Sequence, residues 1–284
     1  MPELEVRVWP DRGNPEEIEY ALVWQPLHDA LSNLPNLKVI FSLGAGVDHL
    51  LKETGLPEGV PIVRMVDPGL SEGMREYVLF HVLRYHRHML EYEIQQRECR
   101  WQELPQTRPG DRRIGIMGLG VLGAEVAQKL TALGFAVAGW SRTAKMIDGV
   151  DSFHGRDQLD QFLEHTDILV CLLPLTSETE GILNRRTFAA LPGGAYVINV
   201  ARGRHLIEEH LLEALDSEHI AGATLDVFRT EPLPRDHPFW RHPKVTVTPH
   251  IASITSPDTG AIPVVENIRR HQKGEPLTNV VDVK

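Results

Sequence analysis

The sequence predicts an α/β protein built from two doubly wound, parallel-sheet domains. Short apolar runs alternate with helical stretches along almost the whole chain, which is the pattern of repeated strand–helix–strand units. Several of these runs are apolar on consecutive residues, as expected of parallel strands covered on both faces. The runs form two groups on either side of a long helical segment at residues 74–94, so we expect two domains.

The expected strands can be assigned in order along the chain. The first group lies in the first quarter, at residues 5–9, 20–24, 37–43 and 61–66. The second group follows the helical segment, at residues 113–118, 135–140, 167–173, 195–200, 221–227 and 244–250. Pro105, Pro109 and Gly110 mark residues 101–113 as the loop that leads into this second group.

The helix expected at residues 74–94 carries a broad apolar stripe. The residues of this stripe are Val78, Val82, Tyr85, Met89 and Tyr92. Their intervals of four, three, four and three residues place them on one helix face. Such a stripe is typical of a helix buried in its own domain, and also of one shared between domains or subunits. The histidines within residues 84–88 have basic neighbours, so we expect a solvent-exposed face there rather than a metal site.

Composition and charge exclude several classes of partner. Hydrophobic residues make up 42% and charged residues 24% of the 284, as in ordinary soluble proteins. The net charge of −10 argues against nucleic acid and an acidic membrane surface as partners. Cys99 and Cys171 lie outside any CxxC pair, so neither a disulfide framework nor a cysteine metal site is expected. We find no secretion signal and no membrane-spanning run, so we expect a cytoplasmic protein. We also expect no metal ion.

A glycine loop in the middle of the chain predicts a dinucleotide site. Gly118, Gly120 and Gly123 have the GxGxxG spacing, which on its own often arises by chance. Here the loop follows an expected strand and opens an expected helix at residues 121–133, which Gly134 ends. Glycines in this place let the backbone approach a pyrophosphate, which then binds the N–H groups of the helix start. The alternative is a glycine-rich turn that only packs helix against strand.

The end of the next strand indicates which dinucleotide binds. Ser141, Arg142 and Thr143 occupy the place where an NAD site usually has an Asp or Glu for the ribose hydroxyls. A guanidinium between two hydroxyl groups is better suited to a 2′-phosphate, which Arg binds through two hydrogen bonds. We therefore predict a preference for NADP(H). If Arg142 only stacks on the adenine, NAD(H) is used as well.

A second glycine loop lies between an expected strand and an expected helix of the first group. His49 stands where the third glycine of a dinucleotide loop would be, so a second dinucleotide is not expected. Free N–H groups at a helix start suit a small carboxylate, although a purely structural turn is the alternative. Gly44 and Gly46 are the glycines of this loop.

Three charged side chains follow the last strands of the second group, namely Arg202, Glu231 and His250. Because ligands of open α/β sheets bind beyond the carboxyl ends of the strands, we expect all three in one crevice with the nicotinamide. They suit the reduction of a 2-oxo acid: Arg202 polarises the carbonyl, His250 donates a proton, and Glu231 orients the imidazole and favours its charged form. Taken singly, Glu231 could cap a turn and His250 could be an ordinary loop residue. Arg204 lacks such support and is expected to face solvent.

Five segments are similar to the D-isomer-specific 2-hydroxyacid dehydrogenases. They are GIMGLGVLG, CLLPLTSETEGILN, INVARG, DVFRTEPLPRDHPFW and TPHIAS. The resemblance covers nearly the whole chain. Within that family, LGAGVDHLL, the Arg142 turn and the chain length most resemble the branch of reductases that act on glyoxylate and hydroxypyruvate.

The resemblance implies how the domains are arranged. A Rossmann domain at residues 76–256 would be inserted in a flavodoxin-like substrate domain formed by residues 1–75 and 257–284. The chain is short for the family, but residues 274–284 are expected to return to the first domain, so we expect no catalytic part to be missing. The resemblance also implies a homodimer joined largely through the helix at residues 74–94.

The resemblance further implies which residues surround the ligands. It makes Arg202, Glu231 and His250 the catalytic triad, and makes Leu43, Gly44, Ala45, Gly46 and Val47 the loop that binds the substrate carboxylate. Independently of the resemblance, Trp24, Met74, Trp101 and Trp240 could narrow the pocket toward small acids, and of these we expect Trp24 to contact the substrate. Besides the residues named above, those expected to contact the cofactor are Val121, Leu122, Leu173, Pro174, Thr176, Val200, Ala201, Asp226 and Ala252.

These observations predict NADPH-dependent reduction of small 2-oxo acids, glyoxylate to glycolate or hydroxypyruvate to D-glycerate, with His250 as the proton donor. One alternative is a D-2-hydroxyacid dehydrogenase with another substrate, such as formate, phosphite or a bulkier 2-oxo acid. Another is a nucleotide-sensing interaction protein, because related folds serve as NAD(H)-dependent corepressors that retain the triad. The lack of an obvious peptide-docking extension disfavours this second alternative.

Overall fold

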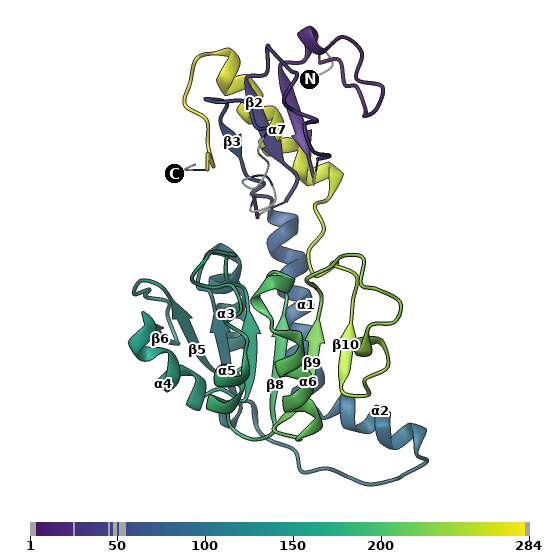
Figure 1. The fold of residues 1–284 in the computed structure, drawn as a ribbon. Helices are drawn as coiled ribbons and strands as arrows, with labels where there is room; N and C mark the ends of the chain where they lie inside the picture. Colours follow the sequence, from purple (N-terminus) through teal and green to yellow (C-terminus); the bar gives the residue numbers. More distant parts are fainter. Residues whose placement is uncertain (1–3, 25, 45, 48–49, 51–54, 282–284) are drawn as a thin grey trace. The chain divides into compact units, whose positions relative to one another are not determined.

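The fold consists of two units, each with a parallel sheet (Figure 1). The computed structural model describes residues 4–24, 26–44, 46–47, 50 and 55–281. One unit contains residues 1–70 and 254–284, and the other contains residues 71–253. The second unit therefore lies within the sequence of the first, and the predicted α/β class is confirmed.

The unit at residues 71–253 is built on a seven-stranded sheet, counted over the described residues. Its strands are β4 (Arg113–Met117), β5 (Ala136–Ser141), β6 (Val150–His154), β7 (Ile168–Cys171), β8 (Ala195–Asn199), β9 (Ile220–Leu225) and β10 (Val245–Val247). The strand order is β10-β9-β8-β7-β4-β5-β6, and every neighbouring pair is parallel. The order reverses between β4 and β7, which is where ligands of such sheets bind.

Helices cover both faces of this sheet, and each face has its own apolar core. Side chains of α1 (Pro68–His86) and α3 (Val121–Ala132) pack in one core. Side chains of α4 (Leu159–Glu164), α5 (Arg185–Ala190) and α6 (Glu208–Asp216) pack in the other. In β7, Ile168 and Val170 belong to the first core, whereas Leu169 and Cys171 belong to the second. This double burial explains why the strand is apolar on consecutive residues.

The other unit has a smaller sheet with the order β1-β2-β3, counted over the described residues. Its strands are β1 (Tyr20–Val23), β2 (Val39–Ser42) and β3 (Ile62–Val63), all parallel. Alternate residues of β2 face two cores, one of which includes Ile268 of α7 (Pro257–Gln272). The Val281 N–H donates to the carbonyl of Ile62 at 2.8 Å. The end of the chain therefore returns to this unit, as expected.

Two strand assignments differ from the prediction. Residues 5–9 form no strand in the described part of the chain; Val6 and Val8 are exposed there, and an extended segment without a paired neighbour gains little stability. The prediction of a strand at residues 5–9 is therefore wrong. Strand β6 was not predicted, because it is an edge strand with mostly exposed and polar residues.

The predicted helix at residues 74–94 is instead two helices, α1 and α2 (Met89–Arg97). His88 between them has a φ of 57°, a left-handed conformation that no continuous helix contains. The expectation of a solvent-exposed face at residues 84–88 is also wrong in part, because His86 is only 4% exposed. The described residues contain no group of three His, Cys, Asp or Glu side chains able to hold a metal ion. Over the same residues, we find no helix with the length and apolar character needed to cross a membrane.

Candidate active site

The three predicted catalytic side chains lie beyond the carboxyl ends of three strands in the seven-stranded sheet. Arg202 follows β8, Glu231 lies in the loop after β9, and His250 lies in the loop after β10. Because β8, β9 and β10 are parallel neighbours, their carboxyl ends lie side by side. The order of these strands therefore brings together residues that are far apart in the sequence.

His250 and Glu231 are hydrogen-bonded, with His250 Nδ1 and Glu231 Oε2 2.8 Å apart. Each of the two side chains is 29% exposed. The other carboxylate oxygen of Glu231 accepts a hydrogen bond from the N–H of Phe228 at 2.9 Å. Burial raises the pKa of Glu231, but the hydrogen bonds from His250 and Phe228, with the charges of His250 and Arg202, outweigh it. The pKa of Glu231 is consequently below its ordinary value, and the carboxylate is charged at neutral pH.

The loop that carries Arg202 packs directly against the loop that precedes Glu231. A Cβ atom on Gly203 would lie 1.8 Å from the carbonyl carbon of Phe228, so only glycine permits this approach. The Arg202 guanidinium donates to the Ala201 carbonyl at 2.7 Å. Its charge contributes to the lowered pKa of Glu231, so the arginine acts electrostatically on the His250–Glu231 pair.

Arg204 has a partner that the sequence does not reveal. Its Nη2 atom donates to both carboxylate oxygens of Glu180 at 2.8 Å, and Arg229 Nη2 lies 3.7 Å from the same carboxylate. Glu180 thus links the Arg202 loop to the loop that precedes Glu231. The Arg204 side chain is 39% exposed, in agreement with its expected place at the surface. Its ion pair with Glu180 was not predicted, because a partner 24 residues away leaves no local sequence pattern.

Asp226 holds the loop that carries His250. Its backbone carbonyl accepts from the His250 N–H at 2.9 Å. Its carboxylate accepts from the N–H groups of Ile251 and Ala252, each at 2.8 Å. The Asp226 side chain is buried, and His250 has a left-handed backbone with a φ of 56°. This conformation is unfavourable for a residue other than glycine, and the three hydrogen bonds to Asp226 offset its cost.

The glycine loop has the geometry that a dinucleotide requires. Gly118 has a φ of 106°, and a Cβ on Gly123 would lie 1.8 Å from the carbonyl oxygen of Gly118. A Cβ on Gly120, by contrast, would meet no atom within 4 Å. Gly118 and Gly123 are therefore required by the fold, whereas Gly120 leaves the start of α3 open to a ligand. These residues fit the pyrophosphate of a dinucleotide.

The residues that follow β5 fit an additional phosphate. Arg142 and Thr143 are exposed, whereas Ser141 is buried and its hydroxyl donates to the Thr143 carbonyl at 2.7 Å. The Arg142 guanidinium makes no hydrogen bond or ion pair with any other residue that the structure describes. A cation held at the end of β5 without an internal partner is suited to binding a phosphate group.

The other residues predicted to contact the cofactor lie in the same unit, mostly at the ends of its strands. Leu173, Val200, Ala201 and Ala252 are buried, Leu122 is half-buried, and Val121, Pro174 and Thr176 are exposed. Thr176 Oγ1 accepts from the N–H of Glu178 at 3.3 Å, within a turn after β7. This turn follows the strand next to β4 and so lies on the side of the sheet where a ligand is expected.

The second glycine loop belongs to the other unit. Gly44 is buried and lies against the Trp24 ring. A Cβ atom added to Gly44 would be only 2.2 Å from that ring. The Leu43 N–H donates to the Val23 carbonyl at 2.9 Å, and Gly46 and Val47 are half-buried. Ala45 lies outside the described residues, as does much of the helix expected after this loop. Trp24 and the loop are therefore in contact, as a shared pocket wall would require.

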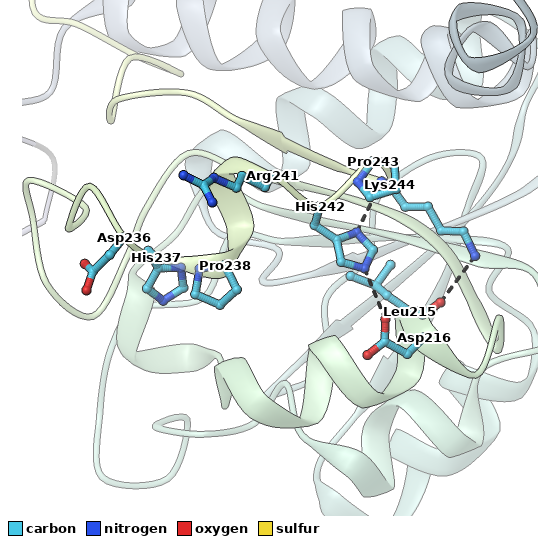
Figure 2. A pocket seen from close by; sticks show the side chains of 9 residues that line it. All are labelled: Leu215, Asp216, Asp236, His237, Pro238, Arg241, His242, Pro243 and Lys244. Atoms are coloured by element: carbon cyan, nitrogen blue, oxygen red, sulfur yellow. Dashed lines mark hydrogen bonds and ion pairs between the residues drawn. The ribbon is translucent and has the colours of Figure 1, made fainter. Parts of the chain in front are cut away.

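Figure 2 shows a surface hollow in the unit at residues 71–253. It is lined by Leu215, Asp216, Asp236, His237, Pro238, Arg241, His242, Pro243 and Lys244. His242 Nε2 lies 3.5 Å from an Asp216 oxygen, and Lys244 Nζ donates to the Leu215 carbonyl at 3.3 Å. Lys244 directly precedes β10, so this hollow is at the amino end of the strand and not beside His250.

Sequence reasoning missed Glu180, Tyr77 and Thr248. The Tyr77 hydroxyl and Thr248 Oγ1 are 2.6 Å apart, and Thr248 Oγ1 donates to Asp226 Oδ1 at 2.6 Å. The one sequence signal is that Thr248 lies two residues before His250. Tyr77 lies on a helix far from it in the sequence, and only the folded structure shows their contact.

Comparisons with known proteins show which family the chain is similar to. The family model described as D-isomer specific 2-hydroxyacid dehydrogenase, NAD binding domain, matches residues 79–252. The chain is 50% identical to the glyoxylate/hydroxypyruvate reductase A of Serratia proteamaculans, over 100% of this chain and 92% of that protein.

Two solved structures show the same similarity over nearly the whole chain. One is a D-isomer specific 2-hydroxyacid dehydrogenase from Xanthobacter autotrophicus in complex with NADPH and MES. Its TM-score is 0.91 at 50% identity, over 95% of this chain and 86% of that chain. The other is an NADPH-dependent glyoxylate/hydroxypyruvate reductase from Sinorhizobium meliloti in complex with NADP and sulfate. Its TM-score is 0.89 at 44% identity, over 94% of this chain and 85% of that chain.

Proposed function

The chain belongs to the D-isomer-specific 2-hydroxyacid dehydrogenase family, and we propose that it is an NADPH-dependent reductase of small 2-oxo acids. Its substrates are glyoxylate, which gives glycolate, and hydroxypyruvate, which gives D-glycerate. The full-length similarity to a reductase named for these two acids supports this choice. The observation that carries the proposal is the His250–Glu231 pair of 2.8 Å, beside Arg202 at the carboxyl ends of β8, β9 and β10.

The chain's own residues account for the preference for NADPH. Gly118, Gly120 and Gly123 hold the pyrophosphate at the start of α3, and Arg142 binds the 2′-phosphate. Two similar structures, by their descriptions, contain NADPH or NADP, which supports this choice. When bound, NADPH supplies the hydride that the carbonyl carbon of the substrate accepts.

Arg202, His250 and Glu231 provide the remaining chemistry. Arg202 binds the substrate carboxylate and stabilises the negative charge that develops on the carbonyl oxygen. His250 gives that oxygen a proton from Nε2, because Nδ1 is paired with Glu231. Glu231 stays ionised, since its pKa lies below the ordinary value, and its charge stabilises the protonated imidazole before the transfer.

NADPH and the three catalytic side chains belong to the unit at residues 71–253 in this proposal. We also propose that the backbone of the loop at residues 43–47 binds the substrate carboxylate. Trp24, which contacts this loop, would limit the size of the acid.

We also propose that the protein is a cytoplasmic homodimer. Phe80 and Leu83 of α1 are 63% and 40% exposed, although Val78, Val82 and Tyr85 of the same helix are fully buried. Met89 and Trp101, which follow in the chain, are 45% and 99% exposed. We call Phe80, Leu83, Met89 and Trp101 the dimer surface, because exposed apolar side chains of this kind favour a protein–protein contact. Both cysteines are free thiols, as is usual in a reducing compartment.

A panel of 2-oxo acids tests the activity. Glyoxylate, hydroxypyruvate, pyruvate and a branched-chain 2-oxo acid are each supplied with NADPH or with NADH at equal concentration. We expect the highest kcat/KM with glyoxylate or hydroxypyruvate and NADPH, exceeding the value with NADH by at least about tenfold. A best rate with the branched acid would contradict the substrate assignment. Binding of NADPH without turnover of any acid would favour a nucleotide-sensing role instead.

A further inference from the structure

The His250 loop depends on a chain of hydroxyl groups that leads away from the catalytic side chains. Asp226 fixes the backbone of this loop by accepting from His250, Ile251 and Ala252. Its Oδ1 atom also accepts a hydrogen bond of 2.6 Å from Thr248 Oγ1. Thr248 therefore directs its single hydroxyl proton toward the carboxylate and is the side chain that helps to orient it.

The Tyr77 hydroxyl determines the direction of that proton. It lies 2.6 Å from Thr248 Oγ1, and because the Thr248 proton already goes to Asp226, Tyr77 must be the donor in this pair. Burial raises the pKa of the Tyr77 hydroxyl, so the group stays protonated and can always donate. The Tyr77 ring also packs on His81, with centroids 4.4 Å apart, which limits the movement of the hydroxyl.

We propose that Tyr77 is a positioning residue for the reaction, which acts through Thr248 and Asp226 to hold His250 in its catalytic orientation. This inference rests on the proposed function, in which His250 transfers the proton. Tyr77 does not contact substrate or cofactor in this account. Its hydroxyl orients Thr248, Thr248 orients the Asp226 carboxylate, and that carboxylate holds the loop in its left-handed conformation.

The same helix offers a matched control. Tyr85 lies two turns farther along α1, and its hydroxyl and Thr224 Oγ1 are 2.7 Å apart. Thr224 is inside β9 and has no hydrogen bond to the His250 loop, among the contacts of the described residues. Removing either tyrosine hydroxyl costs one hydrogen bond from α1 to a threonine, which is buried for Tyr85 and partly buried for Tyr77. Only Tyr77 is connected to Asp226 through its threonine.

Tyr77→Phe and Tyr85→Phe therefore separate positioning from general stability. We expect Tyr77→Phe to lower kcat for glyoxylate by about tenfold and to change KM for NADPH by less than about twofold. Tyr85→Phe should leave kcat within about twofold of wild type, although both variants lose a similar amount of thermal stability. An unchanged kcat in Tyr77→Phe, or an equal loss in both variants, would overturn the proposal.

Variants at Thr248 test whether the hydroxyl chain is the route. Thr248→Val keeps the shape but removes the hydroxyl, so kcat should fall at least as far as in Tyr77→Phe. Thr248→Ser restores the hydroxyl and should recover most of that loss. The double variant Tyr77→Phe/Thr248→Val should be no slower than Thr248→Val alone, because both changes break the same chain. A double loss equal to the product of the single losses would contradict a shared route.

Hydrogen exchange of the backbone amides at residues 250–252 tests the positioning without turnover. We expect faster exchange in Tyr77→Phe and wild-type exchange in Tyr85→Phe. If the wild-type protein reduces no 2-oxo acid but Tyr77→Phe still exchanges faster, the proposed function fails and the loop assignment stands. If the wild type is active and Tyr77→Phe matches it in both exchange and kcat, the positioning role fails and the function stands.

Discussion

Glu231 shows how one side chain connects structure to pH dependence. The pKa of Glu231 is below its ordinary value because hydrogen bonds from His250 and Phe228 outweigh the effect of burial. A carboxyl group with a lowered pKa stabilises the fold above its unfolded pKa, and this contribution is lost as pH falls through the folded pKa. Protonation of Glu231 therefore limits neither stability nor activity near neutral pH, and matters only in acid.

Replacing that carboxylate should change the pH profile of reduction. In Glu231→Gln the imidazole loses the negative charge that stabilises its protonated form. We expect the alkaline limb of kcat/KM for glyoxylate to move toward lower pH, with a roughly tenfold loss of rate on that limb. The check is a pH profile of both proteins with saturating NADPH. Superimposable alkaline limbs would show that Glu231 does not act on His250 electrostatically.

Arg142 provides the test of cofactor choice at a single position. It is exposed after β5, and Arg142→Ala removes a guanidinium that the fold itself does not use. We expect the Kd for NADPH to rise roughly 10- to 100-fold, because hydrogen bonds to a charged group are lost, and the Kd for NADH to stay within about twofold. Titration calorimetry with both cofactors measures this difference. An equal loss for both would show that Arg142 does not bind the 2′-phosphate.

The positions of the strands were largely predictable, because double burial produces consecutive apolar residues in β4, β7 and β8. Arg202, Glu231 and His250 could be chosen because they lie in the loops after three late strands, behind a dinucleotide loop. The break between α1 and α2 could not be predicted, since Leu90 and Tyr92 continue the apolar periodicity past His88. A left-handed histidine is set by the packing on each side of it, which local sequence does not encode.

Gly203 determines how closely two loops approach, and this can be tested by adding one methyl group. In Gly203→Ala the new Cβ would lie 1.8 Å from the carbonyl carbon of Phe228 and 2.1 Å from its oxygen. Because backbone atoms cannot move aside cheaply, we expect a loss of about 2–3 kcal/mol in the free energy of unfolding and a large fall in kcat.

The matched control is Gly193→Ala, where a Cβ would meet no atom within 4 Å and the backbone is not left-handed. Its free energy of unfolding should stay within about 0.5 kcal/mol of the wild-type value. Denaturant unfolding measures both variants. A Gly203→Ala protein as stable and active as the control would show that the two loops need not touch.

At the scale of the whole molecule, the proposed dimer surface would account for the two apolar faces of α1. Phe80 and Leu83 lie opposite the buried face of α1. We expect the double variant Phe80→Ser/Leu83→Ser to shift the molar mass in light scattering from that of two chains to that of one. Met146→Ser changes an apolar side chain that is 99% exposed elsewhere in the same unit, and should remain a dimer. A monomeric wild type, or a dimeric double variant, would contradict this surface.

The division into two units could also be anticipated, because a long helical segment separates two groups of strands in the sequence. The hydroxyl chain from Tyr77 to Asp226 could not, since it connects α1 to loops more than a hundred residues away. The same is true of Glu180, which bridges arginines from two different loops. Contacts of this kind depend on strand order, and no local pattern in the sequence records them.

The measurement that most directly tests the proposed reaction compares wild type with His250→Ala. NADPH oxidation is followed in the presence of glyoxylate, and NADPH binding is measured separately by calorimetry. We predict steady turnover by the wild type, a loss of at least roughly a hundredfold in His250→Ala, and a Kd for NADPH that stays within about twofold. Equal turnover by the two proteins, or NADPH binding by the wild type without any oxidation, would contradict the account.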